Sequence, residues 1–105
     1  MVYGMPLEIL SIMFYVYILY SLKDNKFYNG FTTDLRKRVK EHQGKKVLST
    51  KGRIPLNLVY YEAYLSEKDA LKREKYFKTD KGKKSLKLML KNYLESLKTG
   101  GIGQN

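Results

Sequence analysis

Residues 15–42, YVYILYSLKDNKFYNGFTTDLRKRVKEH, constrain the fold most, because two strand patterns, a turn and a helix follow one another directly. Aromatic and β-branched residues, which favour strands, fill residues 15–21 and 27–32. Between them, KDNK supplies the Asp and Asn that turns favour. The pattern predicts an antiparallel hairpin. Such a hairpin is expected to set Tyr17 and Tyr28 side by side.

A basic helix is predicted directly after the hairpin. Either Thr33 or Asp34 can cap it, since both side chains accept hydrogen bonds from the free amides of a first helical turn. Leu35 and Val39, with the stem of the neighbouring arginine, are expected to face inward. The helix is predicted to end near Gly44.

The rest of the chain predicts one further strand and two further helices. Residues 44–55 form a basic loop with two glycines and a proline, and residues 56–65 show the strongest strand pattern. SEKD resembles a capping box and opens a helix over residues 66–78. TDKGKK is expected to break that helix, and leucines at helical spacing predict a last helix over residues 85–97.

The element order β-β-α-β-α-α predicts an α+β fold, with a three-stranded central antiparallel sheet flanked by helices. A chain of 105 residues suits one domain. We place that domain at residues 13–97. Residues 1–12 are expected to be an N-terminal extension that can be disordered. Residues 98–105 are expected to be a flexible glycine-rich tail.

The charge of the chain favours a polyanionic partner. The sequence contains 21 Lys and Arg against 10 Asp and Glu, a net charge of +11. The preferred interpretation is that the chain binds nucleic acid. The alternative is that it is a soluble protein whose surface is simply rich in lysine. The absence of cysteine excludes disulfides and thiolate zinc sites and suits a cytoplasmic protein. The longest apolar run, residues 9–20, is too short to span a membrane.

The motif residues resemble those of the GIY-YIG nuclease family. Tyr17 lies on the first strand and YNG, residues 28–30, on the second. In that family an arginine follows the second tyrosine by ten positions, an aromatic or imidazole residue lies one turn further on, and a later helix carries a glutamate. Arg38, His42 and Glu74 match these positions. The resemblance covers about residues 14–90 and is greatest to the small single-domain, excision-repair-nuclease-like branch.

The resemblance implies a role for each matched residue in DNA cleavage. Tyr28 would take a proton from water, Tyr17 would hydrogen-bond nearby, and Arg38 would bind the phosphate, assisted by His42. Glu74 would hold one divalent ion, Mg²⁺ or Mn²⁺. Substrate contacts are expected from Gly30, a close-approach or bulge position, and from Arg36, Lys51 and Arg53. The expected assembly is a monomer or weak homodimer, with low sequence specificity or with specificity supplied by a partner.

Departures from the motif leave a second reading open. Tyr15-Val16-Tyr17 replaces Gly-Ile-Tyr, and Asn29 replaces isoleucine. The alternative function is a non-catalytic, basic nucleic-acid-binding module with a nuclease-like fold. At the level of single residues, the two tyrosines can also be ordinary sheet aromatics, and Glu74 can be held in a salt bridge instead of by a metal.

Overall fold

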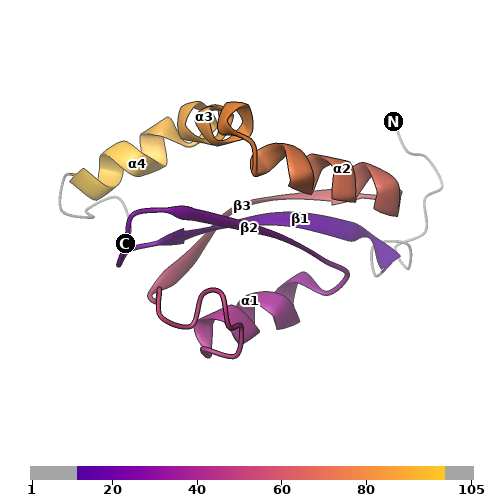
Figure 1. Cartoon of the computed structure of the whole chain (residues 1–105), viewed down its shortest axis with the longest axis horizontal. Helices are drawn as coiled ribbons and strands as arrows, with labels where there is room; N and C mark the ends of the chain where they lie inside the picture. Colours follow the sequence, from indigo (N-terminus) through magenta and orange to yellow (C-terminus); the bar gives the residue numbers. More distant parts are fainter. Residues whose placement is uncertain (1–11, 99–105) are drawn as a thin grey trace.

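A three-stranded antiparallel sheet organises the molecule, in strand order β2-β1-β3 (Figure 1). The structure is a computed structural model that describes residues 12–98. Its elements in chain order are β1 (Phe14–Ser21), β2 (Phe27–Thr32), α1 (Leu35–Gln43), β3 (Leu56–Tyr64), α2 (Glu67–Phe77), α3 (Asp80–Met89) and α4 (Lys91–Lys98). The predicted α+β class and the central antiparallel sheet are confirmed.

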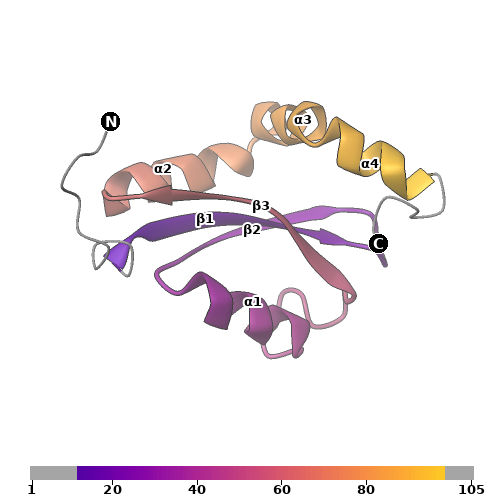
Figure 2. The same cartoon turned by 180° about the vertical axis from the view of Figure 1, so that it is seen from behind.

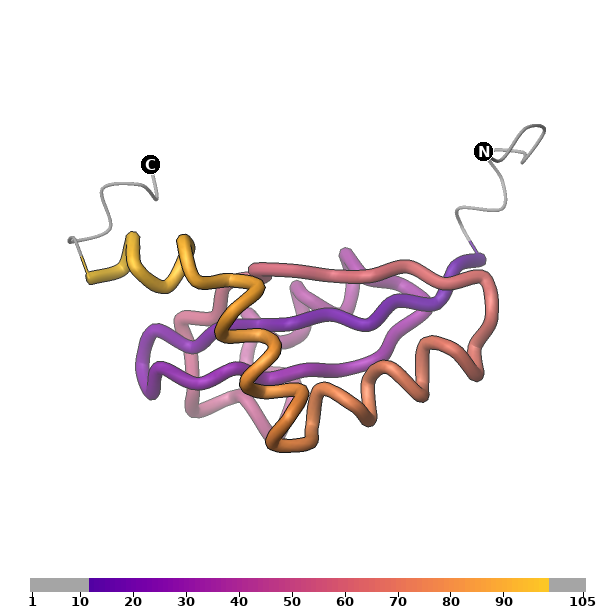
Figure 3. Tube along the Cα trace, turned by 90° about the horizontal axis from the view of Figure 1, so that it is seen from above, coloured from indigo at the N-terminus to yellow at the C-terminus, as the bar shows by residue number. Residues whose placement is uncertain are grey.

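Helices cover both faces of the sheet. In Figures 1 and 2, α1 lies on one face, and α2, α3 and α4 lie on the other. Viewed from above, these last three helices follow one another along the sheet (Figure 3). Since β1 is the central strand and has helices on both sides, it is buried on both faces and reads as a continuous apolar run.

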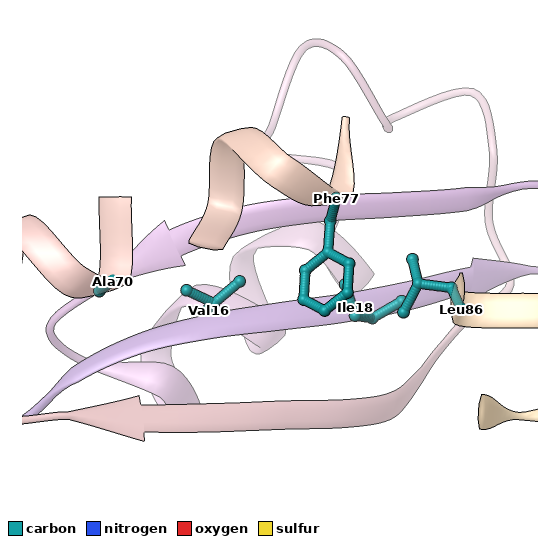
Figure 4. Packing of buried hydrophobic residues seen from close by; sticks show 5 residues of the cluster. All are labelled: Val16, Ile18, Ala70, Phe77 and Leu86. Carbon is teal, nitrogen blue, oxygen red and sulfur yellow. The ribbon is translucent and has the colours of Figure 1, made fainter. Parts of the chain in front are cut away.

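Alternate residues of β1 serve two separate cores. Val16 and Ile18 point towards α2 and α3, where they pack with Ala70, Phe77 and Leu86 (Figure 4). Side chains two residues apart share one face of a strand, so the intervening residues point to the α1 face. There Tyr17, Leu19 and Leu56 form a second cluster, against which Tyr28, Leu35, Val39 and Ile54 pack. One core therefore binds α2 and α3, and the other positions α1.

Side-chain caps start the helices at the predicted places. Of the two candidates for α1, Asp34 is the cap, because its carboxylate accepts the Lys37 amide (Oδ1···N 3.2 Å). Ser66 caps α2 by accepting the Asp69 amide. Leu35 and Val39 face inward as predicted.

The C-terminal helical region differs from the prediction in two respects. TDKGKK is not a long break: Thr79 caps a new helix through the Gly82 amide (3.0 Å), and α3 already begins at Asp80. A Cβ on Gly82 would contact the Tyr76 carbonyl and lie 2.8 Å from the Phe77 Cα. Gly82 therefore serves close packing of α3 on the end of α2 and does not break the helix. The helix predicted over residues 85–97 is divided at Leu90 into α3 and α4.

The two predicted terminal segments fall almost entirely outside the described residues. Only Ile12 of the first segment and Lys98 of the second are described, the latter as the last residue of α4. Within residues 12–98, no helix has both the length and the apolar character needed to cross a membrane.

Candidate functional site

Tyr17 lies across Gly30 of the neighbouring strand. The two residues are opposite each other in the β1–β2 ladder. A Cβ built on Gly30 would collide with the Tyr17 hydroxyl and lie 2.5 Å from its Cζ. The phenol of Tyr17 thus occupies the space that a side chain at position 30 would fill. Gly30 lies in the regular β1–β2 ladder, so close approach, and not a bulge, accounts for the glycine.

The Tyr17 hydroxyl is held by a buried histidine on α1. It lies 2.8 Å from His42 Nε2, and His42 Nδ1 lies 2.7 Å from Thr50 Oγ1. Tyr17, His42 and Thr50 are 2%, 5% and 1% exposed, so all three residues of this group are buried. The contact joins β1, the end of α1 and the loop that follows it.

Arg38 completes this group from the preceding turn of α1. Its guanidinium lies near enough to Tyr17 to lower the pKa of that phenol, and it makes an ion pair with Glu41 (Nη1···Oε1 3.2 Å), yet the side chain is 40% exposed. The Tyr17 oxygen and His42 Nε2 share one hydrogen bond, and His42 Nδ1 and Thr50 Oγ1 share another, so both ring nitrogens of His42 have a partner.

Burial keeps both groups neutral at pH 7. It raises the pKa of the Tyr17 phenol above 10, and Arg38 offsets this only in part. Burial and the nearby Arg38 charge lower the pKa of His42 below 6.5. A neutral phenol and a neutral imidazole therefore lie beside a permanent cation whose outer side faces solvent. This arrangement suits the binding of an anion such as a phosphate.

Tyr28 does not pair with Tyr17 across the hairpin as predicted. The turn closes with a Ser21–Lys26 hydrogen bond (N···O 3.0 Å), and the resulting register places Tyr28 opposite Leu19. Tyr28 is thus diagonal to Tyr17 on the α1 face. Its hydroxyl donates to Asp24 Oδ2 at 2.5 Å.

Asp24, in the turn, also contacts a predicted substrate-binding arginine. Arg53 Nε lies 3.3 Å from Asp24 Oδ2. Burial and the bond to Asp24 raise the pKa of the Tyr28 phenol. The Asp24 carboxylate is itself partly desolvated, but hydrogen bonds from the Tyr28 hydroxyl and the Lys26 amide and the charge of Arg53 keep its pKa below the ordinary value.

Glu74 reaches the site from α2, on the other face of the sheet. Its backbone carbonyl accepts a hydrogen bond from Asn29 Nδ2 (2.9 Å), which ties α2 to β2. Its carboxylate is 17% exposed, binds Lys78 Nζ at 2.9 Å, and lies near enough to Tyr17 to raise the pKa of that phenol. The salt bridge foreseen as an alternative is thus present. Asn29, a departure from the family motif, supports Glu74.

The single Glu74 carboxylate suits a magnesium ion only if phosphate oxygens of a substrate supply further ligands. Within residues 12–98, no three His, Asp or Glu side chains are grouped to bind a metal. Mg²⁺ keeps several waters and is commonly held by one or two carboxylates plus phosphate oxygens. Glu74 supplies one such carboxylate, which Lys78 holds in this structure.

Two predicted substrate-binding residues lie apart from the tyrosines. Arg36 faces an open groove of about 740 Å³ between α1 and β3, which Lys40, Leu58 and Tyr61 also line. Lys51 is exposed on the loop after α1. The structure therefore brings together Tyr17, Arg38, His42, Gly30 and, from the far face, Glu74.

Sequence reasoning missed Asp24, Asn29 and Thr50 as contributors to the site. Asp24 was read only as a turn residue, and Asn29 only as a departure from the motif. Thr50 lies in the basic loop of residues 44–55, and the residue alone indicates no particular chemistry. Their contacts span 4 to 45 positions in the chain, so no local pattern could have indicated the longer ones.

The fold and the site together define a small α+β domain with two tyrosines, an arginine, a histidine and a glutamate around an edge strand. Comparison with known proteins agrees: a family model described as the GIY-YIG catalytic domain matches residues 13–87. This chain belongs to the GIY-YIG family.

Similar proteins carry the name UPF0213. One from Limosilactobacillus reuteri is 40% identical over 88 residues, which cover 81% of this chain and 91% of the relative. One from Clostridium perfringens is 45% identical over 67 residues, or 63% and 71% of the two chains. The solution NMR structure of a Bacillus halodurans UPF0213 protein is 38% identical and has a TM-score of 0.48, with 73% of this chain and 84% of that chain covered.

Proposed function

We propose that this protein is a metal-dependent endonuclease that hydrolyses phosphodiester bonds in DNA. The observation that carries the proposal is the Arg38–Tyr17–His42 arrangement, in which two buried neutral groups lie beside a cation that remains partly exposed. An exposed guanidinium with neutral neighbours is well suited to bind phosphate oxygens. Membership of the GIY-YIG family supports the same reaction class.

Arg38 binds the scissile phosphate in this proposal. On substrate binding its guanidinium exchanges Glu41 for phosphate oxygens, with which it can form two parallel hydrogen bonds. Charge that develops on the phosphate during attack strengthens these bonds in the transition state, which is how they accelerate hydrolysis. The Tyr17–His42–Thr50 hydrogen bonds fix the end of α1 to β1, and so hold in place the helix that carries Arg38.

Glu74 would hold the divalent ion from the other face of the sheet. When bound, Mg²⁺ or Mn²⁺ supplies Lewis-acid polarisation of the phosphate and stabilises the negative charge on the departing oxygen. Glu74 must first release Lys78, whose ammonium is then free to contact the nucleic acid. Asn29 keeps the Glu74 turn of α2 against β2 throughout.

Nicking of supercoiled plasmid by the purified protein, with Mg²⁺, Mn²⁺ or EDTA, tests the proposal. We expect metal-dependent nicking that falls by a factor of about 100 or more in Glu74→Gln and Arg38→Gln, the loss typical when a charge-stabilising group is removed. Glu67→Gln is the matched control, because Glu67 is an exposed carboxylate in the first turn of the same helix. It should nick at the wild-type rate.

Intact plasmid under all three conditions, in a protein that still retards DNA on a gel, would contradict the nuclease proposal. It would favour the alternative function, a basic nucleic-acid-binding module that retains the fold. A Glu74→Gln variant as active as wild type would overturn only the assignment of the metal ligand.

A further inference from the structure

The Tyr28 phenol is already hydrogen-bonded to a carboxylate. It donates to Asp24 Oδ2 at 2.5 Å. The carboxylate is fixed on its other side, because Oδ1 accepts the Lys26 amide at 3.1 Å. Asp24 is only 20% exposed, and Arg53 lies against the oxygen that Tyr28 uses. The phenol therefore has a defined acceptor for its proton.

This contact poses a chemical problem for a tyrosine that must take a proton from water. Phenols ionise near pH 10, and the surroundings of Tyr28 raise its pKa further. Near pH 7 the oxygen of Tyr28 consequently carries its proton. A protonated phenol can accept a proton from water only if it gives its own proton away in the same step.

We propose that Asp24 is the final proton acceptor in the hydrolysis and that Tyr28 passes the proton to it. The inference rests on the proposed nuclease function. Water oxygen bonds to phosphorus while the bond from phosphorus to the departing sugar oxygen breaks. One water proton moves to the Tyr28 oxygen, and the Tyr28 proton moves to Asp24 Oδ2. Asp24 returns its proton to solvent, from which the departing oxygen takes one.

The surroundings of Asp24 suit this task across neutral pH. The charged and titratable side chains that act on it are Tyr28 of β2, Arg53 of the loop before β3 and Tyr20 of β1. Tyr28 and Arg53 favour the carboxylate, so Asp24 is ionised well below pH 7 and ready to accept a proton. Direct contact of Asp24 with the attacking water is unnecessary, since the phenol bridges the two.

The test is the pH dependence of plasmid nicking by wild type and by Asp24→Asn, with Mg²⁺, from pH 6 to 9.5. An amide can accept the Tyr28 hydrogen bond but cannot take its proton. We expect wild type to vary little with pH. The variant should be about 100-fold slower at pH 7 and gain about tenfold per pH unit, because its phenol must ionise alone. Asp24→Glu should restore part of the rate.

Asp69→Asn, in the exposed first turn of α2, is the control and should leave the wild-type profile unchanged. A proton inventory of wild type in H₂O/D₂O mixtures is a second readout that needs no variant. Two protons moving together should give a curved plot. Nicking by wild type, with an identical pH profile for a folded Asp24→Asn variant or a linear inventory, would overturn the relay. Failure of wild type to nick would overturn the nuclease proposal itself.

Discussion

Gly30 determines where the Tyr17 phenol can lie. The ring lies directly over this glycine, and its hydroxyl contacts His42. Any side chain at position 30 would occupy the same volume as the phenol. The glycine of the YNG triplet is thus required by packing between the two strands, and its effect on the site is transmitted through Tyr17.

Gly30→Ala should destabilise the protein and displace Tyr17. Because protein cores accommodate an inserted methyl group poorly, we expect a loss of about 1–3 kcal/mol in the free energy of unfolding, measured by urea denaturation. Nicking should fall as well. Gly52→Ala is the matched control, since a Cβ there would meet no atom within 4 Å. Equal stabilities of the two variants would show that Tyr17 moves aside without cost.

At the scale of elements, polar side-chain contacts help to fix α1 and α2 to the sheet. His42 joins the end of α1 to β1 and to the following loop. Arg73 of α2 forms a bidentate ion pair with Glu62 of β3 (2.9 and 3.1 Å), and the phenols of Tyr60 and Tyr64 bind the same carboxylate. The positions of Arg38 and Glu74 therefore depend on contacts made elsewhere on their helices.

The His42 connection should weaken in mild acid. The pKa of His42 is lowered in the folded protein, so the unfolded chain, with a pKa near 6.5, binds the proton more readily. The stability that His42 contributes is complete above about pH 6.5 and is lost as pH falls through the lower folded value. We expect the Tm of wild type to decrease between pH 7.5 and 5.5, measured by circular dichroism.

His42→Gln should be less stable at pH 7.5 and should show a smaller decrease of Tm over the same range. The chain contains one histidine, so its imidazole NMR signals report the titration directly. The same decrease in Tm for both proteins would place the acid sensitivity elsewhere.

For the whole molecule, excess positive charge is the dominant property. All 21 Lys and Arg residues lie between positions 23 and 98, and the net charge is +11. The molecule measures only 44 × 30 × 30 Å, so these charges act at short range on any bound polyanion. Affinity for DNA should then come mostly from phosphate contacts, which release counterions and carry no sequence information.

DNA binding should weaken steeply with salt. If Arg36, Arg38, Lys51 and Arg53 each neutralise a phosphate, a plot of log K against log salt concentration has a slope of about −4. Fluorescence anisotropy with a labelled duplex measures it, in EDTA to prevent cleavage. Lys51→Gln should reduce the slope by about 1, whereas Lys83→Gln on α3 should leave it unchanged. Equal effects of both variants would exclude the loop after α1 as the preferred contact.

Most of the fold was predictable because it depends on local patterns. The aromatic and β-branched runs predicted all three strands, and Asp34 and Ser66 marked two helix starts. The start of α3 was missed because glycine and lysines read as a break. Only the tertiary structure shows that Gly82 packs against the end of α2.

The sequence by itself determined which chemical groups are present: the motif spacing indicated Tyr17, Tyr28, Arg38, His42 and Glu74, and the family they imply is confirmed. The tertiary structure decided how these groups are paired. A strand register shifted by two residues separates the two tyrosines. A contact between distant segments gives Tyr17 a histidine, and the fold of the hairpin turn gives Tyr28 an aspartate. Local sequence patterns determine helices and strands through backbone preferences. Which side chain accepts a given proton depends on distances between side chains, and these are set only when the elements pack.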